Sequence, residues 1–252
     1  MKKIVNEKIL EYEKEKKFNE HLNPVDTSIC LPVDENFPFV PKAKSLKLKR
    51  FFQNLFIVKP FVNHINRKTK TKVFGKENIK NINSAIVTCN HIYTFDCLVA
   101  KKSLSHKMKM IGAEFNNRKD FLGEMMRAGG MLPLSHKISV MRKFNEAIKY
   151  YLDNNYFVLF YPEQAMWDFY EKPRPLKDGA FHYASKHNVA IIPTFITFRE
   201  HKDEIYFDFH ILKPIYPKNN LSLKENTNFL KTENYARWKE QYELSYNKKL
   251  KL

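Results

Sequence analysis

The sequence contains little cysteine and little glycine, and it has no long apolar run. Its three cysteines form no C-x-x-C pair and no even set, which indicates a reducing compartment and argues against a disulfide scaffold or a cysteine-built zinc site. The six glycines form neither G-x-x-x-x-G-K nor G-x-G-x-x-G, so the two commonest nucleotide-phosphate motifs are excluded. No run of about 18 apolar residues predicts a conventional transmembrane helix, and the charged residues 1–17 lack the apolar core of a signal peptide.

Basic residues outnumber acidic ones by 44 to 27, which gives a formal net charge of +17. A positive field attracts anions in general, including nucleic acid, anionic lipid headgroups and acidic cofactors, and it does not select among them. The 21 Phe and 13 Tyr residues are enough to supply apolar surface as well as a core. The length of 252 residues suits one large domain with terminal additions.

The first 69 residues divide into two segments. Residues 1–41 predict a charged helix over 3–20 and an extended connector over 23–41, which contains four prolines. Residues 42–69 combine a basic run with apolar residues at steps of four and three, which predict one face of a helix that is kinked at Pro60. The residues of this face are Phe51, Leu55, Val58, Val62 and Ile65. Two interpretations stay open: a helix in the membrane interface with its lysines on anionic headgroups, or a core-packed helix with a solvated basic flank.

From residue 84 onward, short apolar runs alternate with helical stretches. Strands are predicted at 85–88, 108–111, 131–134, 156–161, 190–198 and 205–209, and helices at 95–104, 120–128, 139–153, 179–187 and 226–246. This alternation predicts an α/β fold with a mixed, largely parallel sheet flanked by helices. In such sheets ligands bind at the carboxyl ends of the strands. We assign this domain to residues 70–215 and a C-terminal helical segment to residues 216–252.

A histidine and an aspartate follow the first of these strands. The segment SAIVTCNHIYTFD places Asn90 and His91 directly after the strand and Asp96 five residues beyond His91. Five helical steps separate two side chains by roughly 140°, so the two can meet only if His91 lies in the strand-to-helix turn and Asp96 in the first helical turn. His21 and Asp26 have the same spacing inside the connector, which we attribute to chance.

The cysteines beside this segment offer a second possible nucleophile. Cys89 and Cys97 flank the His–Asp segment. Cys89 is predicted within the strand, where a free buried cysteine usually behaves as a small hydrophobe. Tyr161, at the end of a later strand, is interpreted as a core residue.

Three further segments follow in a fixed order. A strand ends in Tyr161-Pro162-Glu163, the helix LKDGAFHYA follows, and the strand VAIIPTF contains a proline. Together with N-H-x4-D, this order resembles the phospholipid/glycerol acyltransferase family of the lysophosphatidate acyltransferase type, over roughly residues 75–215. The resemblance implies that His91 is the general base, that Asp96 orients it and that Glu163 helps to hold the acceptor. It also implies no metal or bound cofactor, with acyl-CoA or acyl-carrier protein as the donor.

The sequence departs from the family pattern at the positions that contact the acceptor. Tyr93-Thr94 stands where the family prefers a serine, and Thr94 could supply that hydroxyl. PEQAMW replaces PEG[ST]R, and Leu134-Ser135-His136-Lys137 replaces a segment that ends near a phosphate-binding arginine. Lys137, Arg174 and Lys177 are candidates for the missing phosphate contacts, and each could equally be a solvated surface cation. The full set of candidate substrate-binding residues is Asn90, Thr94, Glu163, Gln164, Lys137, Arg174 and Lys177.

The expected function is acyl transfer to a hydroxyl of a lysophospholipid, with 1-acyl-glycerol-3-phosphate as the favoured acceptor and phosphatidate as its product. The expected location is the cytoplasmic face of the cell membrane, as a peripheral or monotopic protein. Its partners would be membrane phospholipids and the acyl donor, with no nucleic acid. Three alternatives stay open: a different acceptor, a non-catalytic binder of anionic membranes on the same fold, and a hydrolase in which His91 and Asp96 activate water.

Overall fold

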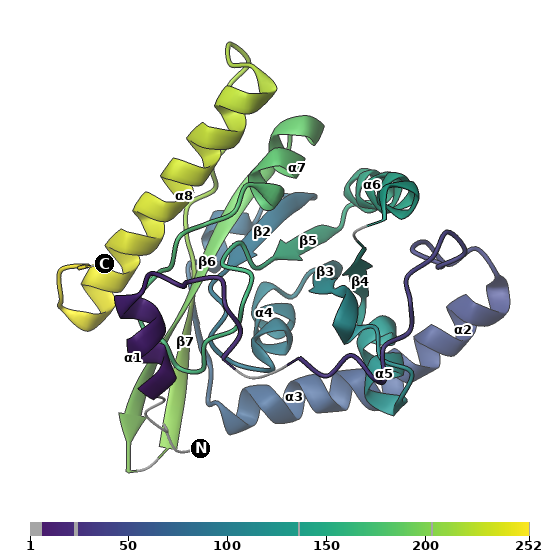
Figure 1. Cartoon of the computed structure of the whole chain (residues 1–252), viewed down its shortest axis with the longest axis horizontal. Helices are drawn as coiled ribbons and strands as arrows, with labels where there is room; N and C mark the ends of the chain where they lie inside the picture. Colours follow the sequence, from purple (N-terminus) through teal and green to yellow (C-terminus); the bar gives the residue numbers. More distant parts are fainter. Residues whose placement is uncertain (1–6, 23–24, 136, 203, 252) are drawn as a thin grey trace.

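A seven-stranded sheet forms the centre of the protein in the computed structural model, which describes residues 7–22, 25–135, 137–202 and 204–251 (Figure 1). The strand order is β1-β7-β6-β2-β5-β3-β4. The strands are β1 (Lys72–Phe74), β2 (Ala85–Cys89), β3 (Met108–Ala113), β4 (Met131–Leu134), β5 (Phe157–Phe160), β6 (Ala190–His201) and β7 (Glu204–Ile211). Every predicted strand is present, and β1 was missed because it has only three residues and no apolar run.

The sheet is mixed and largely parallel, as expected. Strands β4, β3, β5, β2 and β6 run in one direction, because each neighbouring pair is parallel. Strand β7 pairs antiparallel with β6, and β1 pairs parallel with β7 at the sheet edge. Every residue of β2 and β5 is buried, which fits central strands that are covered on both faces. Their carboxyl ends meet at one edge of the sheet, where the sequence places His91.

Helices cover both faces of the sheet (Figure 1). Alternate residues of β2 divide between two cores: Val87 packs with α3 and α4, and Ile86 packs with α6 and α7. The helices of the main domain are α4 (Asp96–Leu104), α5 (Phe121–Gly129), α6 (Ile138–Asp153), α7 (Gly179–His187) and α8 (Leu223–Tyr246). Capping side chains fix the N-termini of two of these helices. Asp120 accepts a hydrogen bond from the backbone N–H of Gly123 at the start of α5, and Ser222 and Glu225 form a capping box at the start of α8.

The N-terminal segment is packed onto the domain rather than extended away from it. Helix α1 (Glu7–Lys14) ends before the predicted limit at residue 20, and residues 3–6 of the predicted range lie outside the described residues. After it the chain runs along the loops beside the site, where Leu31 N donates to Asn117 O at 2.6 Å. It then reaches α6, where the Tyr151 hydroxyl donates to Phe39 O at 2.8 Å. The predicted connector is therefore a tethered part of the domain.

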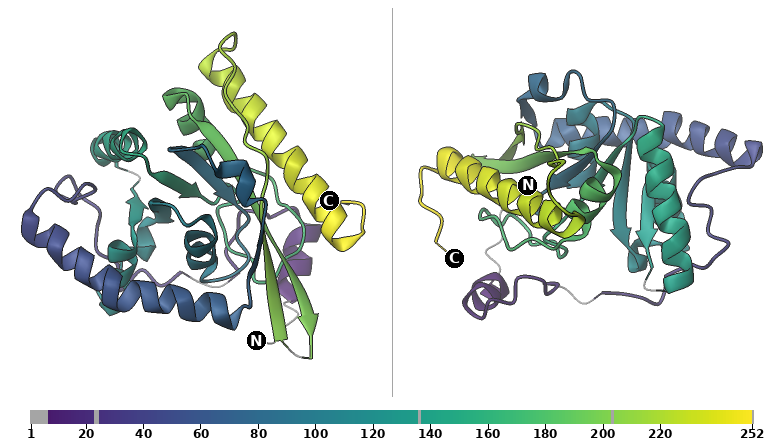
Figure 2. Two further views of the ribbon diagram at one scale, coloured as in Figure 1. Left: turned by 180° about the vertical axis from the view of Figure 1, so that it is seen from behind. Right: turned by 90° about the horizontal axis from the view of Figure 1, so that it is seen from above.

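The predicted apolar helix consists of three joined pieces, seen as one rod in Figure 2. These are α2 (Lys44–Gln53), a π-helical turn (Asn54–Val58) and α3 (Lys59–Lys68). Pro60 lies in the first turn of α3, directly after the π-helical turn. The predicted kink therefore takes the form of a wider turn, in which Lys59 N bonds to Asn54 O.

The predicted single apolar face of this rod is wrong. Val58, Val62 and Ile65 are buried in the domain, whereas Phe51 and Leu55 are exposed. The extra residue in the π-helical turn rotates the later side chains by about 100° relative to a continuous α-helix, which divides the face in two. Among the described residues, no helix combines the length and the apolar character that crossing a membrane requires.

Candidate active site

The turn between β2 and α4 brings His91 and Asp96 together. Asp96 is the first residue of α4, so its carboxylate lies beside the preceding turn. The Nδ1 atom of His91 lies 2.8 Å from Oδ2 of Asp96. The backbone N–H groups of Ile92 and Tyr93 also donate to Oδ2, at 3.2 and 3.4 Å. A carboxylate on Nδ1 favours the tautomer that carries its proton there, which leaves Nε2 available as a base.

Tyr161 contacts both members of this pair, and the sequence interpretation missed it. Its hydroxyl donates to Oδ1 of Asp96 at 2.6 Å. Its ring stacks on the imidazole of His91, with ring centroids 4.0 Å apart and planes 20° apart. Burial, followed by the Asp96 charge, raises the pKa of the Tyr161 hydroxyl well above its usual value. The available signal was its place directly after β5, which neighbours β2 in the sheet.

Glu163 lies next to His91 but is fully enclosed. Its Oε2 atom accepts from the backbone N–H of His91 at 3.0 Å and from the Arg174 guanidinium at 2.8 Å. Its Oε1 atom accepts from the backbone N–H of Arg174 at 2.8 Å. The Glu163 side chain is 1% exposed. The structure therefore places Glu163 behind His91, where both of its oxygens have protein partners.

Arg174 does not lie where a phosphate-binding side chain would, so that expectation is corrected. Its side chain is wholly buried. Besides Glu163, the guanidinium donates to the carbonyl oxygens of Ala165 at 2.6 Å and Phe18 at 3.1 Å, and it lies over the ring of Trp167. An isolated buried cation is costly, and these partners compensate the charge of Arg174 within the fold, while its Nε atom has no hydrogen-bond partner among the described residues. Arg174 joins the loop after β5 to the N-terminal segment.

Asn90 was expected to contact the substrate, but its side chain instead bonds to the backbone of the sheet. Its side chain is buried and forms two hydrogen bonds with the backbone of Ile196 in β6, at 2.9 and 2.7 Å. These bonds continue the β2–β6 pairing one residue past the end of β2. The backbone of His91 is thereby held against the sheet.

The remaining candidates are exposed. Thr94, Gln164, Lys137 and Lys177 all lie at the surface, and their side chains make no hydrogen bond or ion pair with any residue that the structure describes. Thr94 lies in the turn between His91 and Asp96. The backbone N–H of Lys177 donates to Pro162 O at 2.8 Å, which fixes the loop after β5. His136 lies outside the described residues.

The cysteines beside the pair are poor nucleophiles. Cys89 is buried, and burial raises the pKa of its thiol well above the usual value. Burial, with a further contribution from Asp96, raises the pKa of Cys97 to about 12. Because the thiolate is the reactive form, neither residue supplies it near neutral pH. Among the residues with described positions, no three His, Cys, Asp or Glu side chains are grouped as a metal site would require.

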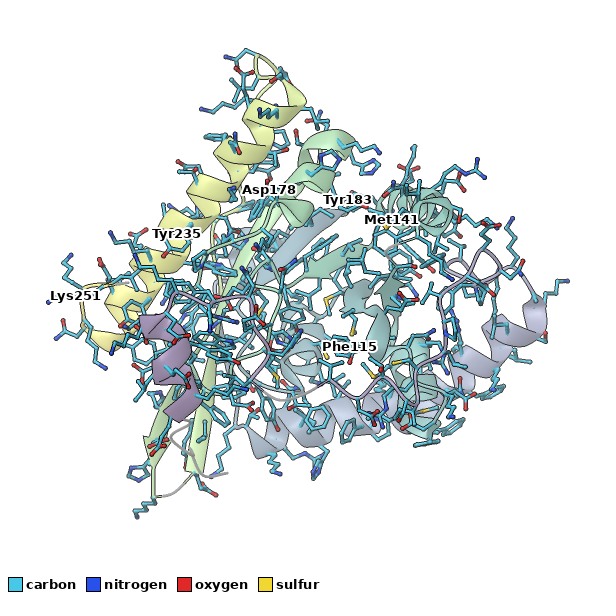
Figure 3. The ribbon with its side chains drawn as sticks, viewed as in Figure 1. Phe115, Met141, Asp178, Tyr183, Tyr235 and Lys251 are labelled. Atoms are coloured by element: carbon cyan, nitrogen blue, oxygen red, sulfur yellow. The ribbon has the colours of Figure 1, made fainter. Side chains whose placement is uncertain are left out.

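His21, which the sequence analysis set aside, lies beside the site. Burial and then the charge of His91 lower the pKa of His21. Its ring lies nearly perpendicular to that of Phe115, the residue labelled in Figure 3, with ring centroids 5.5 Å apart. Asp26 instead accepts hydrogen bonds from the backbone N–H and hydroxyl of Ser28, so the second His-x4-Asp copy is not a pair. An open cavity of about 300 Å³ is lined by His21, Leu22, Val25, Asp26, Phe115, Asn116, Arg118 and Met166.

Comparisons with known proteins identify the family. A sequence model of the Acyltransferase family matches residues 70–197, about half of the chain and nearly all of the predicted domain. No curated protein has a significantly similar sequence. Among solved structures, the fold is similar to that of the 1-acyl-sn-glycerophosphate (LPA) acyltransferase PlsC from Thermotoga maritima, with a TM-score of 0.56, 17% identity, and coverage of 82% of this chain and 91% of that one. The expected fold and family are thereby confirmed, and the chain belongs to the Acyltransferase family.

Proposed function

We propose that the protein transfers a fatty acyl group from acyl-CoA or acyl-carrier protein to a hydroxyl of a lysophospholipid, with 1-acyl-glycerol-3-phosphate as the favoured acceptor. The observation that carries this proposal is the 2.8 Å contact between Nδ1 of His91 and Oδ2 of Asp96. This contact orients Nε2 of His91 as a general base. The His91 side chain is 21% exposed while Asp96 is buried, so the base is accessible and the group that orients it is not.

The proposed reaction uses Nε2 of His91 twice. Nε2 takes the proton from the acceptor hydroxyl, and the oxygen forms a bond to the thioester carbonyl carbon of the donor. Collapse of the tetrahedral intermediate breaks the carbon–sulfur bond, and the imidazolium returns the proton to the departing thiol. Asp96 stabilises the imidazolium between these steps and remains ionised. Atoms and charge balance without a metal or a redox partner.

Glu163 and Arg174 act in this proposal as positioning residues. Glu163 accepts the backbone N–H of His91, and Arg174 holds Glu163 in place. The open cavity lined by His21 and Arg118 also includes Met166, the residue before Trp167, whose backbone N–H donates to His91 O at 3.0 Å. We therefore expect an acceptor headgroup in this space. The exposed Thr94, Gln164, Lys137 and Lys177 remain candidates for contact with either substrate.

We place the reaction at the cytoplasmic face of the cell membrane. Support comes from exposed apolar side chains on α2, the π-helical turn and the start of α5. These side chains are Leu48, Phe51, Phe52, Leu55, Phe56, Phe121 and Leu122. Exposed lysines on α2 lie beside them and suit anionic headgroups. A basic helix with exposed aromatic residues is typical of segments that lie in the membrane interface.

The first test is acyl transfer from a labelled donor to a panel of lysophospholipids in membranes. We expect wild type to acylate at least one acceptor, and His91→Ala and Asp96→Asn to lose activity by about a thousandfold or more, as removal of a general base or its orienting carboxylate does. His201→Ala, at the exposed end of β6, is the matched control and should keep full activity.

The acceptor panel distinguishes the alternatives. Preference for 1-acyl-glycerol-3-phosphate would support the favoured acceptor, and preference for another headgroup would replace it. Release of free fatty acid without an acceptor product would indicate a hydrolase. Absence of transfer with both donor types, from folded and membrane-bound protein, would indicate a non-catalytic membrane binder.

A further inference from the structure

Tyr161 engages Asp96 through its hydroxyl and His91 through its ring. We propose that Tyr161 is a positioning residue, which fixes the Asp96 carboxylate and the His91 imidazole in the geometry needed for proton transfer. This inference rests on the function proposed above, because it assigns a role within the same site. Tyr161 touches no substrate in this assignment and acts through the pair.

The hydrogen bonds of Asp96 are divided between its two oxygens. Oδ1 accepts from the Tyr161 hydroxyl at 2.6 Å. Oδ2 accepts from Nδ1 of His91 at 2.8 Å and from two backbone N–H groups at 3.2 and 3.4 Å. Rotation of the carboxylate would break bonds on both sides. Tyr161 therefore fixes Oδ1 and, together with the two backbone N–H groups on Oδ2, keeps Oδ2 directed at His91.

The ring of Tyr161 restricts the imidazole in a second way. The two rings stack with centroids 4.0 Å apart, so one face of the imidazole is covered and substrate must approach from the remaining side. Tyr161 directly follows β5, which is wholly buried and pairs with β2. The ring thus lies at the end of a buried central strand of the sheet. A phenylalanine at this position would keep the stacking and lose only the hydrogen bond.

The Tyr161 hydroxyl also weakens the attraction between the Asp96 carboxylate and a protonated His91. Burial and the Asp96 charge raise the pKa of Tyr161 well above its ordinary value, so the phenol stays protonated and donates throughout the neutral range. A donor on Oδ1 draws charge from the carboxylate and weakens its attraction for an imidazolium. The other ionisable groups that face His91 are His21, Asp168, Glu163 and Arg174. None of these four loses a partner when the Tyr161 hydroxyl is removed.

The test compares Tyr161→Phe with wild type by NMR titration of the His91 imidazole. We expect the midpoint to move to higher pH, since a carboxylate that loses one donor attracts the imidazolium more strongly. Tyr151→Phe is the matched control, because that buried hydroxyl bonds to Phe39 O, away from the pair. In an Asp96→Asn background, Tyr161→Phe should produce no further shift, since its effect passes through the carboxylate.

Kinetics supply the second readout. At its pH optimum Tyr161→Phe should retain acyl transfer with kcat reduced about tenfold, and the acidic limb of its kcat/KM profile should move to higher pH as the NMR midpoint does. An unchanged midpoint, or an equal shift in the Asp96→Asn background, would overturn the inference. The NMR result does not depend on acyl transfer, so an inactive wild-type protein would contradict the proposed function alone.

Discussion

Glu163 and Arg174 form an ion pair at 2.8 Å whose side chains are almost completely withdrawn from water. Burial of two charges is costly, and their attraction compensates only when further hydrogen bonds satisfy the remaining atoms. Here the backbone N–H groups of His91 and Arg174 donate hydrogen bonds to the Glu163 carboxylate. The Arg174 guanidinium in turn donates to two backbone carbonyl oxygens. The pair is therefore a junction that holds the loop after β5 against the His91 turn.

Removal of one partner should be more damaging than removal of both. We predict that Arg174→Met lowers the free energy of unfolding by about 3 to 5 kcal/mol, because it leaves the Glu163 carboxylate buried and unpaired. Glu163→Gln combined with Arg174→Met should recover part of this loss. Denaturant unfolding monitored by circular dichroism measures both effects.

The control is the exposed pair Lys149–Asp153 on α6. Lys149→Met should leave the unfolding midpoint nearly unchanged, because solvent screens exposed ion pairs. If Arg174→Met behaved like Lys149→Met, the buried pair would not be the junction described above.

Single residues also show which contacts can be predicted from the sequence. The contact between His91 and Asp96 could be predicted from their spacing together with the strand directly before His91, because the two residues then flank one strand-to-helix turn. The Tyr161–Asp96 bond spans 65 residues, and the Arg174–Phe18 bond spans 156. Such contacts depend on the order of strands in the sheet and on the path of the N-terminal segment, and local periodicity reports neither. Glu163 was located by the family resemblance, but its enclosure by Arg174 was not.

At the scale of elements, the alternation of strands and helices could be predicted because apolar residues recur at different spacings in strands and in helices. The apolar face over 51–65 was misread because the π-helical turn (Asn54–Val58) changes the period within the helix. The described part of the connector over 23–41 is irregular chain, as predicted, but proline content does not predict what that chain contacts. In the structure Val25 and Asp26 line the cavity that also contains His21.

The packing of the N-terminal segment gives an element-scale prediction. Phe18 is buried and stacks on Trp167, whose indole N–H donates to Glu20 O at 2.9 Å. Phe18→Ala truncates one of the six buried residues of a small apolar cluster, so we expect amide exchange in residues 7–22 to accelerate at least tenfold. Acyl transfer should fall as well, because the same segment lines the cavity.

The measurement is hydrogen–deuterium exchange followed by mass spectrometry. Leu10→Ala, at an exposed position of α1, is the control and should leave exchange of this segment nearly unchanged. Rapid exchange of residues 7–22 in wild type already, or no acceleration in Phe18→Ala, would contradict the assignment of this segment as a fixed wall of the site.

At the scale of the whole molecule, charge and apolar surface are distributed unevenly. The net charge is +17. Three exposed phenylalanines, Phe51, Phe52 and Phe56, lie together on α2 and the adjoining π-helical turn, where Phe52 stacks on Phe56. Helix α8 lies at the other end of the molecule from α2 in both views of Figures 1 and 2. Composition predicted apolar surface in general, and only the three-dimensional arrangement locates it.

The proposed membrane orientation makes the last prediction. Phe52→Ser combined with Phe56→Ser should weaken binding to vesicles of mixed anionic and zwitterionic phospholipid at least tenfold, because each buried phenyl ring contributes about 1.5 to 3 kcal/mol of transfer free energy. Leu223→Ser combined with Leu244→Ser, at exposed positions of α8, should bind as wild type does. Vesicle co-sedimentation at low and high salt measures both pairs. High salt should weaken the lysine contribution in every variant and leave the difference between the pairs. Equal binding by both double variants would mean that α2 is not the docking surface, and weaker binding by the α8 pair alone would reverse the proposed orientation of the molecule on the membrane.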